Sequence, residues 1–138
     1  MSLTWEQTVG VLVRGVSGWA GVWSLVFAAR GALVELAATP GRDDDLALTY
    51  TGLDLANVLG DLEHVDQFAP GVAVNLRPAD EDGLGAALRV LDDLLMAAER
   101  QVHHLTAADD RSAQDVLAAS RVLGGLAVAR ARIAGGAR

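Results

Sequence analysis

The N-terminal stretch from residue 5 to residue 38 constrains the fold more than any other part of the chain. It holds all three tryptophans of the sequence but only four charged residues. Apolar residues recur in it at spacings of three and four, the pattern of a helix that buries one broad face. The segment is therefore predicted to be helical and buried. The apolar positions are Trp5, Val9, Leu12, Val16, Trp19, Trp23, Val26, Phe27, Leu33 and Val34.

The opposite face of this predicted helix consists mainly of small residues, although a solvated helix would carry Glu, Lys and Arg there. A helix without a strongly polar side is usually buried between other elements or covered by a partner. The small residues mark where a second helix lies, from this chain or from another, while the tryptophans face the core and act as anchors. We predict an interface with a protein partner or a second copy of the chain, formed by Trp5, Gly10, Ser17, Trp19, Gly21, Trp23, Ser24, Ala28 and Gly31.

Glycines interrupt this predicted helix at five positions, residues 10, 15, 18, 21 and 31. Each glycine costs roughly 1 kcal/mol relative to alanine in the interior of a helix. We therefore expect the long first helix to be kinked or broken near Gly15–Gly18. Pro40 and Gly41 follow its end, as is typical of a helix C-terminus.

Three further helical segments follow, and with the first they predict an all-α, antiparallel, four-helix bundle-like domain. The last of them begins after Asp109 and Asp110 and ends at Gly135 and Gly136. The segment before it has the most regular pattern, because its apolar residues alternate at steps of four and three for three heptads. These residues are Leu84, Leu88, Leu91, Leu95, Ala98, Val102 and Leu105.

The remaining segment, from Leu53 to Phe68, has an uncertain beginning. Leu46, Leu48 and Tyr50 alternate with small or polar residues, which is the pattern of a half-buried strand. A short β-hairpin within residues 33–51 is therefore the alternative to a helix here.

Length and charge restrict the classes of function. The chain has 138 residues and a formal net charge of −7, with 18 acidic residues against 11 basic ones. This is the length of one ordinary domain, so residues 1–138 are predicted to form a single helical domain. No nucleic-acid ligand is expected, because binding to phosphate backbones needs a basic surface. The arginines near the C-terminus fit the dipole of the last helix; they are Arg121, Arg130, Arg132 and Arg138.

The longest uncharged apolar run, residues 15–29, is too short to cross a bilayer as a helix. It would span about 22 Å, against a hydrocarbon core of about 30 Å. A secretory signal would need positive charge before the run, but Glu6 precedes it. We therefore expect no membrane span and a cytoplasmic location.

Two pairs of side chains suggest an alternative in which the protein does chemistry. Asp61 and His64 lie three residues apart, and Glu99 and His103 lie four apart, so each pair can project together from its helix. Carboxylate and imidazole groups on facing helices are the ligands with which bundles hold metals. The alternative hypothesis is thus a metal-binding or nucleotide-hydrolysing bundle enzyme that uses these carboxylates and histidines.

No sequence motif for a nucleophile, a phosphate-binding loop or a dinucleotide site is present, and no cofactor is expected. The absence of cysteine also excludes disulfides and thiolate metal ligands. The favoured hypothesis is a non-catalytic protein-protein interaction module that self-associates or binds a partner through its first helix. It would serve as an assembly subunit, an adaptor or an acidic inhibitor.

Overall fold

The structure is a computed structural model that describes residues 5–15, 17–38, 46–65, 68, 71, 73, 83–107 and 112–136. Within these ranges it contains five α-helices and no strand. The predicted all-α class is therefore confirmed. The helices are α1 Trp5–Gly15, α2 Gly18–Ala37, α3 Leu46–Leu62, α4 Gly83–Thr106 and α5 Ala113–Gly136.

The break in the N-terminal segment lies where its glycines predicted it. Helix α1 ends at Gly15 and α2 begins at Gly18, which has a positive φ of 70°. This left-handed backbone conformation is strained for residues with a side chain and readily adopted by glycine. Ser17 before it is extended, with a φ of −152°, so the chain changes direction here and α1 and α2 are separate helices.

The alternative of a β-hairpin within residues 33–51 is wrong, because residues 33–37 belong to α2 and residues 46–51 belong to α3. A strand would place Leu46, Leu48 and Tyr50 on one face, yet only Leu48 is buried. Leu48 instead shares the buried face of α3 with Thr51 and Leu55, at the helical spacings of three and four. The amphipathic pattern of α3 thus begins seven residues earlier than Leu53.

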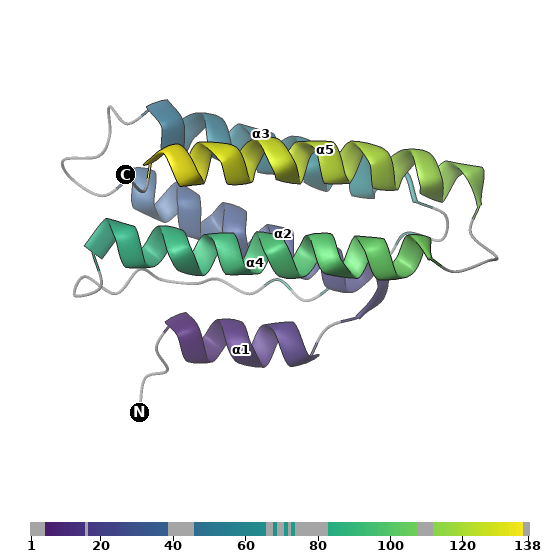
Figure 1. Ribbon diagram of the computed structural model, residues 1–138, viewed down its shortest axis with the longest axis horizontal. Helices are drawn as coiled ribbons and strands as arrows, with labels where there is room; N and C mark the ends of the chain where they lie inside the picture. Colours follow the sequence, from purple (N-terminus) through teal and green to yellow (C-terminus); the bar gives the residue numbers. More distant parts are fainter. Residues whose placement is uncertain are drawn as a thin grey trace.

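Helices α2, α3, α4 and α5 surround a common core in which each packs against two neighbours. Helix α2 contacts α3 and α4, α5 contacts the same two helices, and α1 packs against α4. Figure 1 shows three layers, with α1 in the first, α2 and α4 in the second, and α3 and α5 in the third. The largest fully buried side chains are Leu25, Leu33, Leu36, Leu55, Leu62, Leu88, Leu91, Leu94, Leu95, Leu126, Val22 and Val26.

Helices α3 and α5 run antiparallel and approach closely. Asp54 pairs with Arg132, and four residues further along α3, Val58 lies beside Gly125. A Cβ atom added at Gly125 would lie 2.5 Å from Cγ2 of Val58, whose side chain is fully buried. The missing side chain at Gly125 therefore sets the distance between the two helices.

Two adjacent glycines of α5 allow a test of this close approach. Gly125→Ala is expected to lower the free energy of unfolding by about 1–2 kcal/mol, since overpacking against the stiff Val58 outweighs the gain in helix propensity. Gly124→Ala is the matched control, because a Cβ there meets no atom within 4 Å. Gly124→Ala is expected to raise the free energy of unfolding by up to about 1 kcal/mol, because alanine favours a helix more than glycine does. Denaturant unfolding of both variants measures the difference, and equal stabilisation by both would contradict the close contact.

Candidate functional site

Three of the predicted interface residues on α2 are buried inside the chain itself. Gly21, Ser24 and Ala28 all lie on its buried positions, with Ser24 only 1% exposed and Ala28 fully buried. These three positions are therefore covered by other residues of the same chain. The sequence indicated correctly that the face is covered, but it did not identify what covers it.

Gly71, which lies between α3 and α4 in the sequence, packs on this face. A Cβ atom added at Gly71 would overlap both Oγ of Ser24 and the carbonyl oxygen of Ala20. Backbone therefore packs directly on backbone, which only small residues on both sides permit. The hydroxyl of Ser24 donates a hydrogen bond of 3.1 Å to the carbonyl oxygen of Ala20, so the buried side chain is also satisfied.

The tryptophans whose side chains are described pack against the core. Trp19 and Trp23 are half-buried and pack against the core cluster. Trp23 also stacks on Phe27, with 4.8 Å between ring centroids. Trp5 begins α1, and its side chain lies outside the described part of the structure.

The other three predicted interface residues do not form one surface with them. Gly10 and Gly31 are half-buried on different helices, and Ser17 is exposed between those helices. The N-terminal segment thus supplies the scaffold, and the predicted interface is not a continuous accessible face.

The structure does not bring together the four residues proposed as metal ligands. Asp61 lies on α3 with His64 just after it, whereas Glu99 and His103 lie on α4. Helices α3 and α4 each pack against α2 and α5, at opposite corners of the bundle. Within the described ranges, no group of three or more His, Asp or Glu residues could hold a metal ion. The four residues therefore do not form one ligand set in this structure, since the sequence spacing predicts each pair but not the distance between the two pairs.

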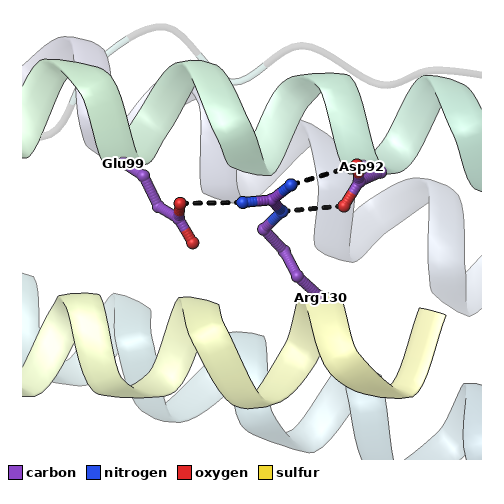
Figure 2. Close-up of polar contacts among 3 residues, drawn as sticks. All are labelled: Asp92, Glu99 and Arg130. Atoms are coloured by element: carbon purple, nitrogen blue, oxygen red, sulfur yellow. Dashed lines mark hydrogen bonds and ion pairs between the residues drawn. The ribbon is translucent and has the colours of Figure 1, made fainter. Parts of the chain in front are cut away.

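Glu99 is instead part of an ion-pair network that joins α4 to α5 (Figure 2). Arg130 holds both oxygens of Asp92, with Nε–Oδ1 at 2.8 Å and Nη2–Oδ2 at 3.3 Å. Its remaining nitrogen, Nη1, lies 2.9 Å from Oε2 of Glu99. The hydrogen bonds with Asp92 raise the pKa of the Arg130 guanidinium above its ordinary value. The arginine is therefore charged at every physiological pH and pairs with both carboxylates.

A second arginine joins α5 to its other neighbour, α3. Nε of Arg132 lies 2.8 Å from Oδ2 of Asp54, and its guanidinium lies 5.5 Å from the ring centroid of Tyr50. Residues two apart on a helix point to opposite sides, so Arg130 faces α4 and Arg132 faces α3. The sequence alone explains these arginines only as cations that suit the helix dipole. Their partners could be found only once the helices had been paired.

Exposed apolar residues gather on the outer side of α3 and α5. Leu46, Tyr50 and Leu53 follow one another on α3 at steps of four and three, and they are 63%, 47% and 55% exposed. On α5, Leu117 and Val128 are 61% and 47% exposed. We call these five residues the α3–α5 surface. Sequence reasoning missed it, because exposed and buried leucines look alike until the core is known.

One described helix, α2, is long and apolar enough to cross a membrane by length and composition. The same test is passed by the core helices of soluble proteins, and 56% of its most apolar window is buried within the structure. The expectation that the chain has no membrane span stays a prediction.

A substitution at Gly71 tests whether this residue packs directly on α2. Gly71→Ala is expected to lower the free energy of unfolding by about 1–3 kcal/mol, because the Ala20 carbonyl cannot rotate away as a side chain could. Gly52→Ala on α3 is the control, since a Cβ at Gly52 meets nothing within 4 Å. Thermal unfolding of the two variants gives the comparison. A Gly71→Ala variant as stable as the wild type would contradict the close contact of Gly71 with Ala20 and Ser24.

The network around Arg130 predicts that lysine cannot replace this arginine. The ammonium group of lysine cannot donate hydrogen bonds to both carboxylates as the planar guanidinium does. Arg130→Lys is therefore expected to lower the free energy of unfolding by about 1 kcal/mol. The loss should shrink at high ionic strength, since these groups are partly exposed. Arg121→Lys, on the exposed side of the same helix, should change stability by less than about 0.5 kcal/mol. Equal effects of the two substitutions in urea unfolding would contradict this role of Arg130.

No protein-family model matches this chain, and no curated protein or solved structure matches it either. The function must therefore be argued from the residues and geometry described above.

Proposed function

We propose that this protein is a non-catalytic helical module that works by binding protein through the α3–α5 surface. In this proposal α2 to α5 form an antiparallel four-helix bundle, with α1 as an additional helix on α4, in a cytoplasmic protein. Assembly subunit, adaptor and acidic inhibitor are the roles that such a module could fill.

One observation carries the proposal. Eight large hydrophobic side chains are exposed among the described residues, and six of them lie on the two contacting helices α3 and α5. Clustered exposed apolar groups on a folded protein mark interaction sites, whereas single ones are ordinary. Val11 on α1 and Val34 on α2 are such single residues.

The pattern of the surface fits a helical partner. Leu46, Tyr50 and Leu53 form one ridge along α3, and ridges of this kind pack into the grooves of another helix. Each apolar group covered contributes about 25 cal/mol per Å² of area removed from water. Tyr50 is the natural anchor because its ring is already held by Arg132, so little conformational freedom is lost on binding.

We propose binding at the α3–α5 surface, whereas the sequence predicted it at the first helix. The small residues of α2 are used within the chain, and the aromatic residues Trp19 and Trp23 stabilise its core. The enzyme alternative is not favoured here, since Arg130 holds Glu99, and since Asp61 lies on α3 whereas Glu99 and His103 lie on α4.

The test replaces apolar surface by charge at two positions. Leu53→Glu with Val128→Glu should weaken binding to a purified, stoichiometric partner at least about tenfold, since burying two unpaired carboxylates costs more than 1.4 kcal/mol. The partner is first identified by quantitative affinity purification of the full chain, then reconstituted and titrated calorimetrically. Val34→Glu with Val11→Glu is the matched control, because it adds the same charge at exposed valines outside the α3–α5 surface.

Circular dichroism checks that both double variants keep the fold. The proposal would be overturned if the control variant lost the partner while the α3–α5 variant retained it. It would also be overturned if no protein, including a second copy, bound the wild-type chain.

A further inference from the structure

We infer that the cleft between α4 and α5 is a second binding site, which takes a dipeptide of two large apolar residues with both termini free. The cleft has a volume of about 630 Å³ and includes the ion pair of Arg130 with Asp92 (Figure 2). This volume is within the range of small-molecule sites in proteins, roughly 300–1,000 Å³. No residue that lines the cleft belongs to the α3–α5 surface, so the inference does not depend on the proposed function.

The floor of the cleft is apolar. Leu88 and Val90 of α4 and Ile133 of α5 line it, and all three are buried. Helix α5 adds the small side chains of Ala131 and Ala134, which are exposed. Small side chains opposite large ones leave the space of the cleft between the two helices. Apolar groups of a ligand are removed from water on this floor, which favours binding.

Two charged side chains at the cleft are available to a ligand. Arg89 and Asp93 both line it and are exposed, and in the described part of the chain no hydrogen bond or ion pair joins either of them to another residue. An arginine four residues before an acid on a helix is the less favourable order for an ion pair. The other two charged residues of the cleft, Asp92 and Arg130, bind each other. One positive and one negative group therefore remain for a ligand.

These two charges select a zwitterion, and their spacing selects its length. Residues four apart on a helix have Cβ atoms about 5–6 Å apart. The termini of an extended dipeptide are separated by at most about 7 Å, whereas both charged groups of a free amino acid are attached to one carbon atom. The guanidinium of Arg89 binds the carboxylate with two parallel hydrogen bonds, and Asp93 accepts hydrogen bonds from the ammonium group.

The neighbouring ion pairs determine the direction of the peptide. Arg130 pairs with both Asp92 and Glu99, so this network has one positive and two negative groups. Its excess of negative charge lies beside Asp93, the next residue after Asp92, and attracts the ammonium group to this end of the cleft. The carboxylate of the peptide then lies one helical turn away, at Arg89.

Isothermal titration calorimetry of the full chain with leucyl-phenylalanine tests the site. One site with a Kd on the order of 0.1 mM is expected, since a ligand of this size binds an open cleft weakly. Ala134→Leu fills part of the cleft and should weaken binding at least about tenfold. Arg121→Gln is the matched control, because Arg121 is exposed on the same helix outside the cleft, and this variant should bind like the wild type. Circular dichroism checks that both variants keep the fold.

Blocked peptides test which residue binds each terminus. The C-terminal amide of the dipeptide should bind the wild type about fivefold more weakly than the free acid, whereas Arg89→Gln should bind both forms alike. The N-acetylated dipeptide gives the same comparison for Asp93→Asn. Each variant should therefore become insensitive to one blocking group and stay sensitive to the other, which a general structural change would not produce.

Three results would overturn the inference. The first is the absence of saturable binding of leucyl-phenylalanine to the wild type at millimolar concentrations. The second is equal binding of the free and blocked peptides by the wild type, and the third is an Ala134→Leu variant that folds and binds the dipeptide like the wild type. Leu53→Glu with Val128→Glu should leave dipeptide binding unchanged, so failure of this inference and failure of the proposed function are distinguishable.

Discussion

The burial of α2 on nearly all sides is the constraint on which the rest of this structure depends. Half of its residues are buried, including Leu25, Leu33 and Leu36. Helices α3 and α4 cover two of its sides, and Gly71 packs on a third, against the backbone of Ala20 and the side chain of Ser24. So apolar a helix can exist in water only if the remaining chain wraps around it.

Helix α5 packs on α3 and α4 through a close backbone contact and ion pairs. Its contact with α3 is close because Gly125 has no side chain, and two arginines on opposite sides direct it. Arg130 bonds to Asp92 and Glu99 of α4, whereas Arg132 bonds to Asp54 of α3. Apolar packing is not directional, so these charged contacts help to select one orientation of α5 between its neighbours.

The accessible apolar residues follow from the same arrangement. Helices α3 and α5 bury one face each, and the opposite faces retain Tyr50, Leu53 and Val128 at about half exposure. Residues that suit a core and lie outside it are best explained by a partner that covers them. We therefore propose association at the layer formed by α3 and α5, whereas Trp19 and Trp23 of the N-terminal segment pack against the core.

The sequence by itself determined the all-α class, the burial of residues 18–37 and the break between Gly15 and Gly18, because hydrophobic periodicity and glycine cost act locally. It also indicated that the small residues of α2 are covered. Only the tertiary structure decided that Gly71 covers Ser24, that Glu99 binds Arg130, and that Leu53 lies outside the core. These facts depend on which helices are neighbours, and spacing within one helix carries no information about the distance to another.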